Sequence, residues 1–268
     1  MPRVVVDDLT IYYDVQGEGE PLLLIPYLGA DHACYAFQLP AYTEHFQCIA
    51  VDLSGSGESD KPRGPYSTET YASQMSGFLT EIGVERAHVA GVSLGAAVGM
   101  HLAAARPDQV LTLSLHSAWD RTDRYLRAIV ELWRALSGSL PLAADGVITG
   151  IFPFCFRPET YVERPDFIES LEAFVRGRPE QPWAAFLAQT EAVLSHDATA
   201  VLGQIKAPTL VTFGAYDIVT STRFAKPLTS AIAGSELVVF DHLSHAGLHE
   251  DPDAFNKATL DFLTRHGG

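Results

Sequence analysis

Cysteine is scarce in this sequence of 268 residues, which contains three: Cys34, Cys48 and Cys155. They form no C-x-x-C spacing, and no arrangement of cysteine and histidine matches a zinc-binding motif. Three scattered thiols exclude a disulfide-stapled scaffold and favour a reducing compartment, which we expect to be the cytoplasm. The sequence also gives no reason to expect a metal or an organic cofactor, so we predict neither.

Basic residues are also few, since 18 Lys and Arg stand against 33 Asp and Glu and leave a formal net charge of −15. Nucleic-acid binding depends on clustered Lys and Arg that displace counterions from phosphates. Because the sequence has no such cluster, we expect no nucleic-acid partner.

Long apolar segments are missing as well. Asp7 and Asp8 interrupt the start of the chain, and no later run reaches the roughly 18 apolar residues of a membrane span. We therefore expect no signal peptide and no membrane partner. Apolar residues nevertheless make up 47% of the chain, which is enough for a large core. The length suits one large α/β domain or a core domain with an insertion.

Short apolar runs alternate with segments of helical spacing along most of the chain. A run that is apolar throughout is typical of a strand buried on both faces, and alternating strands and helices predict an α/β fold with a mostly parallel sheet. Helical spacing is clearest at residues 68–82, 94–105 and 252–264. The predicted strands are residues 4–6, 10–15, 22–25, 48–51, 87–90, 110–115, 209–213 and 236–240.

The alternation stops between residues 119 and 204, where helical spacing and repeated prolines replace the strands. We predict that residues 119–204 form an inserted helical cap and that residues 1–118 and 205–268 form the core domain. The aromatic residues of the cap either build its own core or line a substrate pocket. The candidate pocket residues are Tyr27, Trp119, Trp133, Phe154 and Trp183.

The strongest chemical signal is the sequence Gly-Val-Ser-Leu-Gly at residues 91–95, which lies between a predicted strand and a predicted helix. A sharp strand-to-helix turn needs small residues two positions either side of the serine, and it leaves the hydroxyl exposed above the sheet. Ser93 is therefore the candidate nucleophile. An ordinary turn with the same letters is the alternative reading.

A serine nucleophile needs a histidine base and an acid that orients the histidine. Asp217 follows the predicted strand at 209–213, and His245 follows the next one. Carboxyl ends of parallel strands meet at one edge of a sheet, so we expect these residues to lie near Ser93. Asp120 is the rival acid, and the neighbours of His245, His242 and His249, are expected to be exposed.

Together these residues resemble the α/β-hydrolase fold superfamily, of the serine esterase or lactonase type. Three further segments carry the resemblance: DLSGSGES at 52–59, IKAPTLV at 205–211 and HAGLHEDPDAF at 245–255. The resemblance implies a mostly parallel eight-stranded sheet flanked by helices, with an inserted helical cap. It also implies that Ser93, Asp217 and His245 form the catalytic triad.

By position in this family, the backbone N–H groups of Leu28 and Leu94 would form the oxyanion hole. The sequence departs from the family here, because Pro26 and Tyr27 stand where relatives commonly have His-Gly. Either the loop keeps the same path with Tyr27 in it, or the phenol enters the pocket or forms a hydrogen bond there.

We predict a hydrolase that cleaves a small, mainly apolar carboxylic ester or lactone through an acyl-enzyme on Ser93. Residues 28–31 (LGAD) and 64–67 (GPYS) are similar in part to β-ketoadipate enol-lactonases. The alternatives are a carbon–carbon bond hydrolase, a cofactor-free perhydrolase with the same triad, or a ligand-binding receptor on a hydrolase scaffold. The sequence leaves the oligomeric state open.

Overall fold

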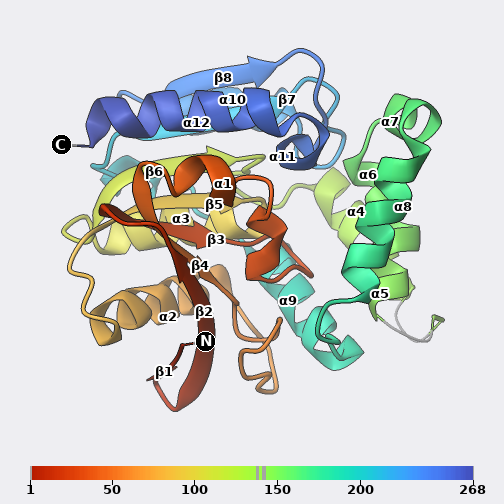
Figure 1. Ribbon diagram of the computed structural model, residues 1–268, viewed down its shortest axis with the longest axis horizontal. Coiled ribbons are helices and arrows are strands. Elements are labelled where there is room, and N and C mark those ends of the chain that lie inside the picture. The colour runs from red at the N-terminus through yellow and green to blue at the C-terminus, as the bar shows by residue number, and fades with distance from the viewer. Residues whose placement is uncertain (1, 137–138, 141–142, 268) are drawn as a thin grey trace.

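An eight-stranded sheet forms the centre of the computed structural model, which describes residues 2–136, 139–140 and 143–267 (Figure 1). The strand order is β1-β2-β4-β3-β5-β6-β7-β8. β2 is antiparallel to both of its neighbours, and the other pairs are parallel. The predicted mostly parallel sheet is therefore confirmed. The strands are β1 (Arg3–Val6), β2 (Leu9–Gln16), β3 (Glu20–Ile25), β4 (Phe46–Val51), β5 (Ala87–Val92), β6 (Val110–His116), β7 (Thr209–Gly214) and β8 (Glu236–Phe240).

Helices cover both faces of the sheet, which is why every residue of β5 and β7 is buried. Leu23 and Ile25 of β3 belong to one buried cluster, and Leu22 and Leu24 belong to another, as the two-residue period of a strand requires. The first cluster packs against α2 (Thr68–Glu81) and α3 (Leu94–Ala105), and the second against α12 (Pro252–His266). The remaining short helices of this part are η1 (His32–Tyr35), α1 (Leu39–Tyr42), η4 (Thr222–Phe224), α10 (Ala225–Ala231) and α11 (Gly247–Glu250).

Between β6 and β7 the described residues form helices, together with an isolated bridge between Arg121 and Asp197. Figure 1 shows α4 to α8 gathered at one side of the sheet, near α11. The apolar side chains of these helices belong to the same buried cluster as those of α3, so a separate domain at residues 119–204 stays a prediction. The helices are α4 (Arg124–Ala135), α5 (Ala143–Gly146), η2 (Val147–Ile151), α6 (Phe152–Cys155), α7 (Pro158–Glu163), α8 (Pro165–Arg176), α9 (Trp183–Ser195) and η3 (Leu202–Gln204).

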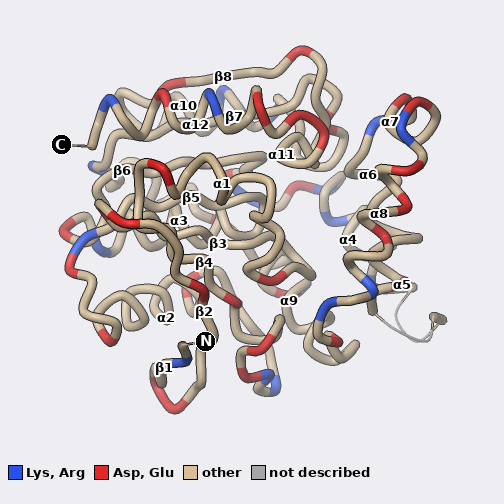
Figure 2. Tube along the Cα trace, in the orientation of Figure 1, with Lys and Arg blue, Asp and Glu red and all other residues tan. Residues whose placement is uncertain are grey.

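Most charged residues lie at the periphery of the fold, and Asp31, Asp52, Asp217 and Glu250 are buried exceptions. Figure 2 shows Asp and Glu mainly in outer helices and turns, whereas β4, β5, β6 and β7 carry no charged side chain. Within the described ranges, no helix is both long enough and apolar enough to span a bilayer.

Candidate active site

Ser93 lies at the turn between β5 and α3 in a conformation that serine rarely adopts, with φ 52° and ψ −115°. The surroundings enforce this turn. Its amide donates to the carbonyl of His116 at 2.8 Å, and its own carbonyl accepts from the amides of Ala96 and Ala97 in the first turn of α3. A Cβ on Gly95 would lie 2.1 Å from the Ile25 carbonyl oxygen. Glycine is required there because β3 and the start of α3 are in direct contact.

Asp217 and His245 form a hydrogen-bonded pair although they come from different loops. Asp217 follows β7 and His245 follows β8, and Asp217 Oδ2 is 2.9 Å from His245 Nδ1. The carboxylate also accepts from the amides of Val219 and Thr220 and from Thr220 Oγ1. Burial by itself would raise the pKa of Asp217, but the charge of His245 and these hydrogen bonds hold the pKa below its usual value. Asp217 is therefore an ionised acid that orients the imidazole.

The rival acid, Asp120, forms a backbone hydrogen bond to another segment of the chain. Its backbone carbonyl accepts from the amide of Ala198 at 2.8 Å, in the segment that follows α9. Since Asp217 Oδ2 is the carboxylate oxygen bonded to His245 Nδ1, the geometry favours Asp217 as the orienting acid.

A buried carboxylate ties the His245 loop to the helices between β6 and β7. Glu250, on α11, accepts from the amide and hydroxyl of Ser244 at 2.7 Å each, from the amide of Arg157 at 3.0 Å and from Thr160 Oγ1 at 2.7 Å. The carbonyl of Cys155 accepts from Ser244 Oγ and from the amide of Ala246. Both sides of His245 are thus fixed to α6 and α7.

Ser93 and His245 line one small cavity of about 80 Å³, which lies between the sheet and the helices α4 to α8. Most of its wall is apolar. Of the predicted pocket residues, Tyr27 and Trp133 line it, and so does Leu28. Three further lining residues, Phe152, Phe156 and Phe174, are aromatic residues of the predicted cap, which the sequence offered as either core or pocket. The sequence did not assign the others to the pocket, because pocket and core side chains look alike in a sequence. These others are Val92, Val147, Ile151, Cys155, Leu171, Val175, Ala246, Leu248 and His249.

The other three predicted pocket residues lie elsewhere. Trp119 is buried, its indole N–H donates to Thr122, and its ring packs on His196. Trp183 packs edge-on against Phe186, and Phe154 packs edge-on against Trp133 at 6.2 Å between ring centroids. These aromatic side chains build the interior of the helical segment and do not line the cavity with Ser93.

His249 also differs from its prediction. The sequence suggested an exposed neighbour of His245, but the side chain is buried and only His242 is half exposed, at 47%. Burial lowers the pKa of His249 to about 4, so its ring is neutral at physiological pH. Its Nε2 atom is 3.0 Å from the hydroxyl of Tyr27.

The loop after β3 keeps a tight turn despite Pro26 and Tyr27. The amide of Ala30 donates to the carbonyl of Tyr27 at 3.1 Å, and Gly29 has φ 77°, which is the arrangement of a type II turn with glycine at its third position. The positive φ therefore falls on Gly29, and Tyr27 needs no glycine-like conformation. Leu28 lines the cavity with Ser93, and Leu94 is the first residue of α3. Leu28 follows Ile25 in the chain and Leu94 precedes Gly95, so the two predicted oxyanion residues belong to the two segments that meet at the contact between Gly95 and Ile25.

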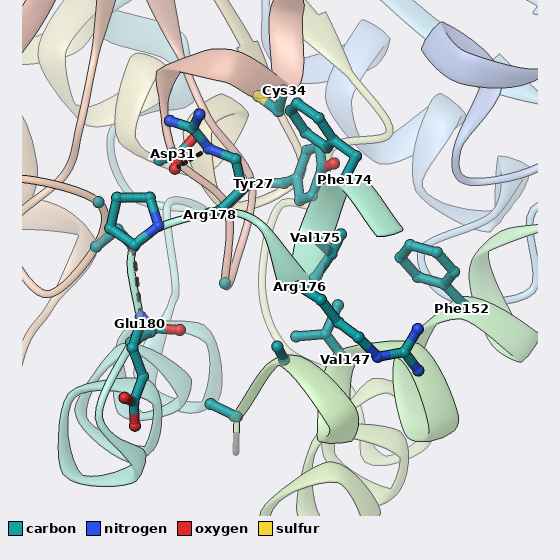
Figure 3. Close-up of a pocket in the computed structure, with 18 residues that line it drawn as sticks. Tyr27, Asp31, Cys34, Val147, Phe152, Phe174, Val175, Arg176, Arg178 and Glu180 are labelled. Carbon is teal, nitrogen blue, oxygen red and sulfur yellow. Dashed lines mark hydrogen bonds and ion pairs between the residues drawn. The ribbon is translucent and has the colours of Figure 1, made fainter. Parts of the chain in front are cut away.

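A second, larger cavity of about 250 Å³ adjoins the first (Figure 3). The two share Tyr27, Val147, Phe152, Phe174 and Val175. The second cavity is the more polar, because Arg176 and Arg178 also line it.

Ion pairs and hydrogen bonds close one side of this second cavity. Arg178 is paired with Asp31 at 2.8 Å, as Figure 3 shows. Gln181 donates to the carbonyl of Gly55, so the connection between α8 and α9 is fixed to two loops of the sheet.

One group of side chains has the spacing of a metal site: Asp31, His32 and Asp52. Its oxygen atoms already have protein partners. Asp52 accepts from His32 Nδ1 and from the amides of His32 and Glu58, and Asp31 is paired with Arg178. This group therefore stabilises the loops after β3 and β4 by ion pairs, and it needs no cation for that role.

Known proteins resemble this chain over nearly its whole length. Residues 20–252 match the family described as alpha/beta hydrolase fold. The chain is 30% identical over 263 residues to "Putative carbamate hydrolase RutD" of Azorhizobium caulinodans, covering 98% of each chain. The enol-lactonase of Burkholderia xenovorans superposes with a TM-score of 0.88 at 25% identity, covering 98% of this chain and 100% of the other. A hydrolase of Pseudomonas aeruginosa superposes with a TM-score of 0.88 at 28% identity, over 98% and 97%.

Proposed function

The chain belongs to the α/β-hydrolase fold family, and from that premise we propose that it is a serine hydrolase that cleaves a small, mainly apolar carboxylic ester or lactone. One observation carries the proposal: Ser93, on its strained turn, lines the same cavity as His245, which is bonded to Asp217. A nucleophile, a base and an orienting acid in this order are what acyl transfer needs.

In the proposed mechanism Ser93 Oγ attacks the carbonyl carbon while its proton moves to His245 Nε2. Asp217 accepts a hydrogen bond from His245 Nδ1 and stabilises the imidazolium. The amides of Leu28 and Leu94 donate to the oxyanion of the tetrahedral intermediate. His245 then protonates the departing alcohol, and the acyl group stays on Ser93. A water that gives its proton to His245 then attacks the acyl carbon. The bond to Ser93 Oγ breaks, His245 returns the proton to Oγ, and the acid is released.

The size and polarity of the cavity support a small substrate. About 80 Å³ accommodates a few carbon atoms beyond the reacting carbonyl, and the wall is mainly aliphatic and aromatic. The similarity to the enol-lactonase of Burkholderia xenovorans, at 25% identity over nearly the whole chain, supports a lactone as well as an open-chain ester.

A carbamate is the second candidate substrate. The observation that favours it is the 30% identity, over 98% of both chains, to a protein named as a carbamate hydrolase. A carbamate is attacked by the same triad, but its acyl-enzyme is a carbamoyl-serine that water attacks more slowly, because the nitrogen lone pair stabilises the carbonyl.

The activated serine is tested without knowledge of the substrate by measuring intact mass after brief exposure to a fluorophosphonate. We expect one adduct on the wild type and none on Ser93→Ala, with both proteins folded by circular dichroism. Absence of an adduct on the wild type, with the probe active on a control hydrolase, would overturn the proposal in favour of a binding module.

The two substrate classes are separated by two compounds of matched shape, para-nitrophenyl butyrate and para-nitrophenyl N-ethylcarbamate. For an esterase we expect repeated turnover of the butyrate, and with the carbamate one equivalent of nitrophenol and a lasting mass increase on Ser93. Repeated turnover of the carbamate would favour the second candidate.

A further inference from the structure

Tyr27 and His249 form a polar pair in the wall of the cavity that holds Ser93 and His245. Tyr27 Oη lies 3.0 Å from His249 Nε2, and the two rings meet edge-on. Tyr27 lines both cavities, and Figure 3 shows it among the residues around the larger one. The proposed mechanism makes no use of this pair.

The hydrogen positions of the pair follow from the surroundings of His249. Its ring is neutral, and the rings of Phe37 and Phe156 lie 5.9 and 6.4 Å away. Its Nδ1 atom is buried without a partner among the described residues. A buried N–H without a partner is less often found than a buried acceptor without one. We therefore assign the imidazole hydrogen to Nε2, which donates it to Tyr27 Oη.

This assignment leaves the hydroxyl hydrogen of Tyr27 without an acceptor in the part of the chain that the structure describes. Burial raises the pKa of Tyr27 well above 10, so the phenol keeps its proton at physiological pH. A hydroxyl that accepts one hydrogen bond becomes a better donor of the next. The wall of the cavity that Ser93 lines thus offers an oriented O–H donor.

We propose that Tyr27 determines specificity, because its hydroxyl donates a hydrogen bond to a second, neutral oxygen of the substrate, outside the reacting carbonyl. This inference rests on the proposed ester or lactone hydrolysis and names the substrate class further: the acyl or the alcohol part carries an ether, hydroxyl or carbonyl oxygen.

A charged group fits this wall less well than a neutral oxygen. None of the described residues that line the cavity with Ser93 is Lys or Arg, and a buried carboxylate needs a charged partner. Arg178 lines the adjoining cavity, but it is already paired with Asp31. Trp133 Nε1, also buried without a partner among the described residues, is a second neutral donor on a residue of the same wall.

The test compares substrates that differ by one oxygen in place of a methylene. Para-nitrophenyl methoxyacetate and para-nitrophenyl butyrate test the acyl part, and methoxyethyl acetate and butyl acetate test the alcohol part. For each pair, kcat/KM of the ether compound is divided by kcat/KM of the hydrocarbon compound. Intrinsic reactivity cancels when this ratio is compared between the wild type and Tyr27→Phe, which retains the ring and loses the hydroxyl.

We expect Tyr27→Phe to lower the ratio for at least one pair roughly three- to tenfold, as one neutral hydrogen bond requires. The matched control is Tyr125→Phe, which removes an exposed hydroxyl from α4 and should leave both ratios unchanged. Unchanged ratios for both pairs in Tyr27→Phe would overturn the inference.

Fluorophosphonate labelling of Ser93 separates this inference from the proposed function. If Tyr27→Phe labels like the wild type while the ratios stay unchanged, the hydrolase proposal stands and the role of Tyr27 is wrong. If the wild type itself does not label, the proposed function has failed first.

Discussion

Ser93 has a left-handed backbone conformation because residues outside its own turn hold it there. Three hydrogen bonds to its backbone and the contact between Gly95 and Ile25 compensate the strain. The same contact places the loop after β3 against the first turn of α3. The proposed nucleophile and the predicted oxyanion residues are therefore positioned by one packed junction.

Gly95→Ala tests that junction. Its Cβ would lie 2.1 Å from the Ile25 carbonyl, which is backbone, so we expect a loss of about 1–3 kcal/mol in the free energy of unfolding, together with a loss of kcat. Gly99→Ala, on the same helix, is the control, because its Cβ would meet side-chain atoms of Leu113 and Val89 at 3.1 and 3.5 Å, which can adjust. Urea unfolding and esterase assays measure both. If the two substitutions had equal effects on stability and kcat, the backbone contact at Gly95 would not have the positioning role that we predict.

Asp217→Asn tests the orienting acid. An amide that donates to His245 Nδ1 would favour the wrong imidazole tautomer, so we expect kcat for para-nitrophenyl butyrate to fall about 10³- to 10⁴-fold. Asp120→Asn is the matched control and should retain nearly full activity, because the Asp217 carboxylate is the one bonded to His245. A larger loss in Asp120→Asn would reassign the acid.

At the scale of elements, α11 connects the loop of His245, the proposed base, to the helices between β6 and β7. The carboxylate of Glu250 accepts hydrogen bonds from Ser244, in the loop of His245, and from Arg157 and Thr160, at the start of α7. Arg164 adds a hydrogen bond to the Glu250 carbonyl at 2.7 Å. Movement of α6 or α7 would therefore displace the loop that carries His245.

Glu250→Gln tests this connection, because it retains the shape of the side chain but replaces an acceptor by an N–H₂ group that faces donors. We expect a loss of about 1–3 kcal/mol in stability from the unpaired groups and a lower kcat as His245 shifts. Glu163→Gln, an exposed glutamate on α7, should change neither quantity. Thermal unfolding and kcat are measured together, and wild-type values for Glu250→Gln would contradict the predicted role.

For the whole molecule, buried neutral histidines set the response to acid. Burial lowers the pKa values of His116, His196 and His249 to about 3, 4 and 4, whereas in the unfolded chain each histidine titrates near about 6.5. Below about pH 6.5 the unfolded chain binds protons that the folded chain does not, so stability falls as the pH falls toward 4.

Each of these histidines should contribute a slope of up to about 1.4 kcal/mol per pH unit within that window. Unfolding free energies measured between pH 7 and 5 give the slope of stability against pH. His196→Gln should lower that slope by the contribution of one histidine, up to about 1.4 kcal/mol per pH unit. His45→Gln, at an exposed position, is the control and should leave the slope as it is. A wild-type slope in His196→Gln would show that its protonation is not linked to folding.

The sequence by itself determined the order of the elements, and it pointed to the candidate residues of the site. Strands that are apolar throughout, the glycines around Ser93 and the positions of Asp217 and His245 after successive strands are local patterns, and each element forms largely from its own residues. The mostly parallel sheet and the membership of the α/β-hydrolase fold family were therefore predictable.

Only the tertiary structure decided which side chains line the cavity. Trp133 lines it and Trp119 packs on His196 instead, although both were equal candidates, because tertiary packing decides which aromatic side chain reaches the cavity. Tyr27 and His249 are 222 positions apart and meet only after β3 and α11 pack together. A contact of that separation leaves no local pattern in the sequence, since it depends on how the elements pack rather than on how each one forms.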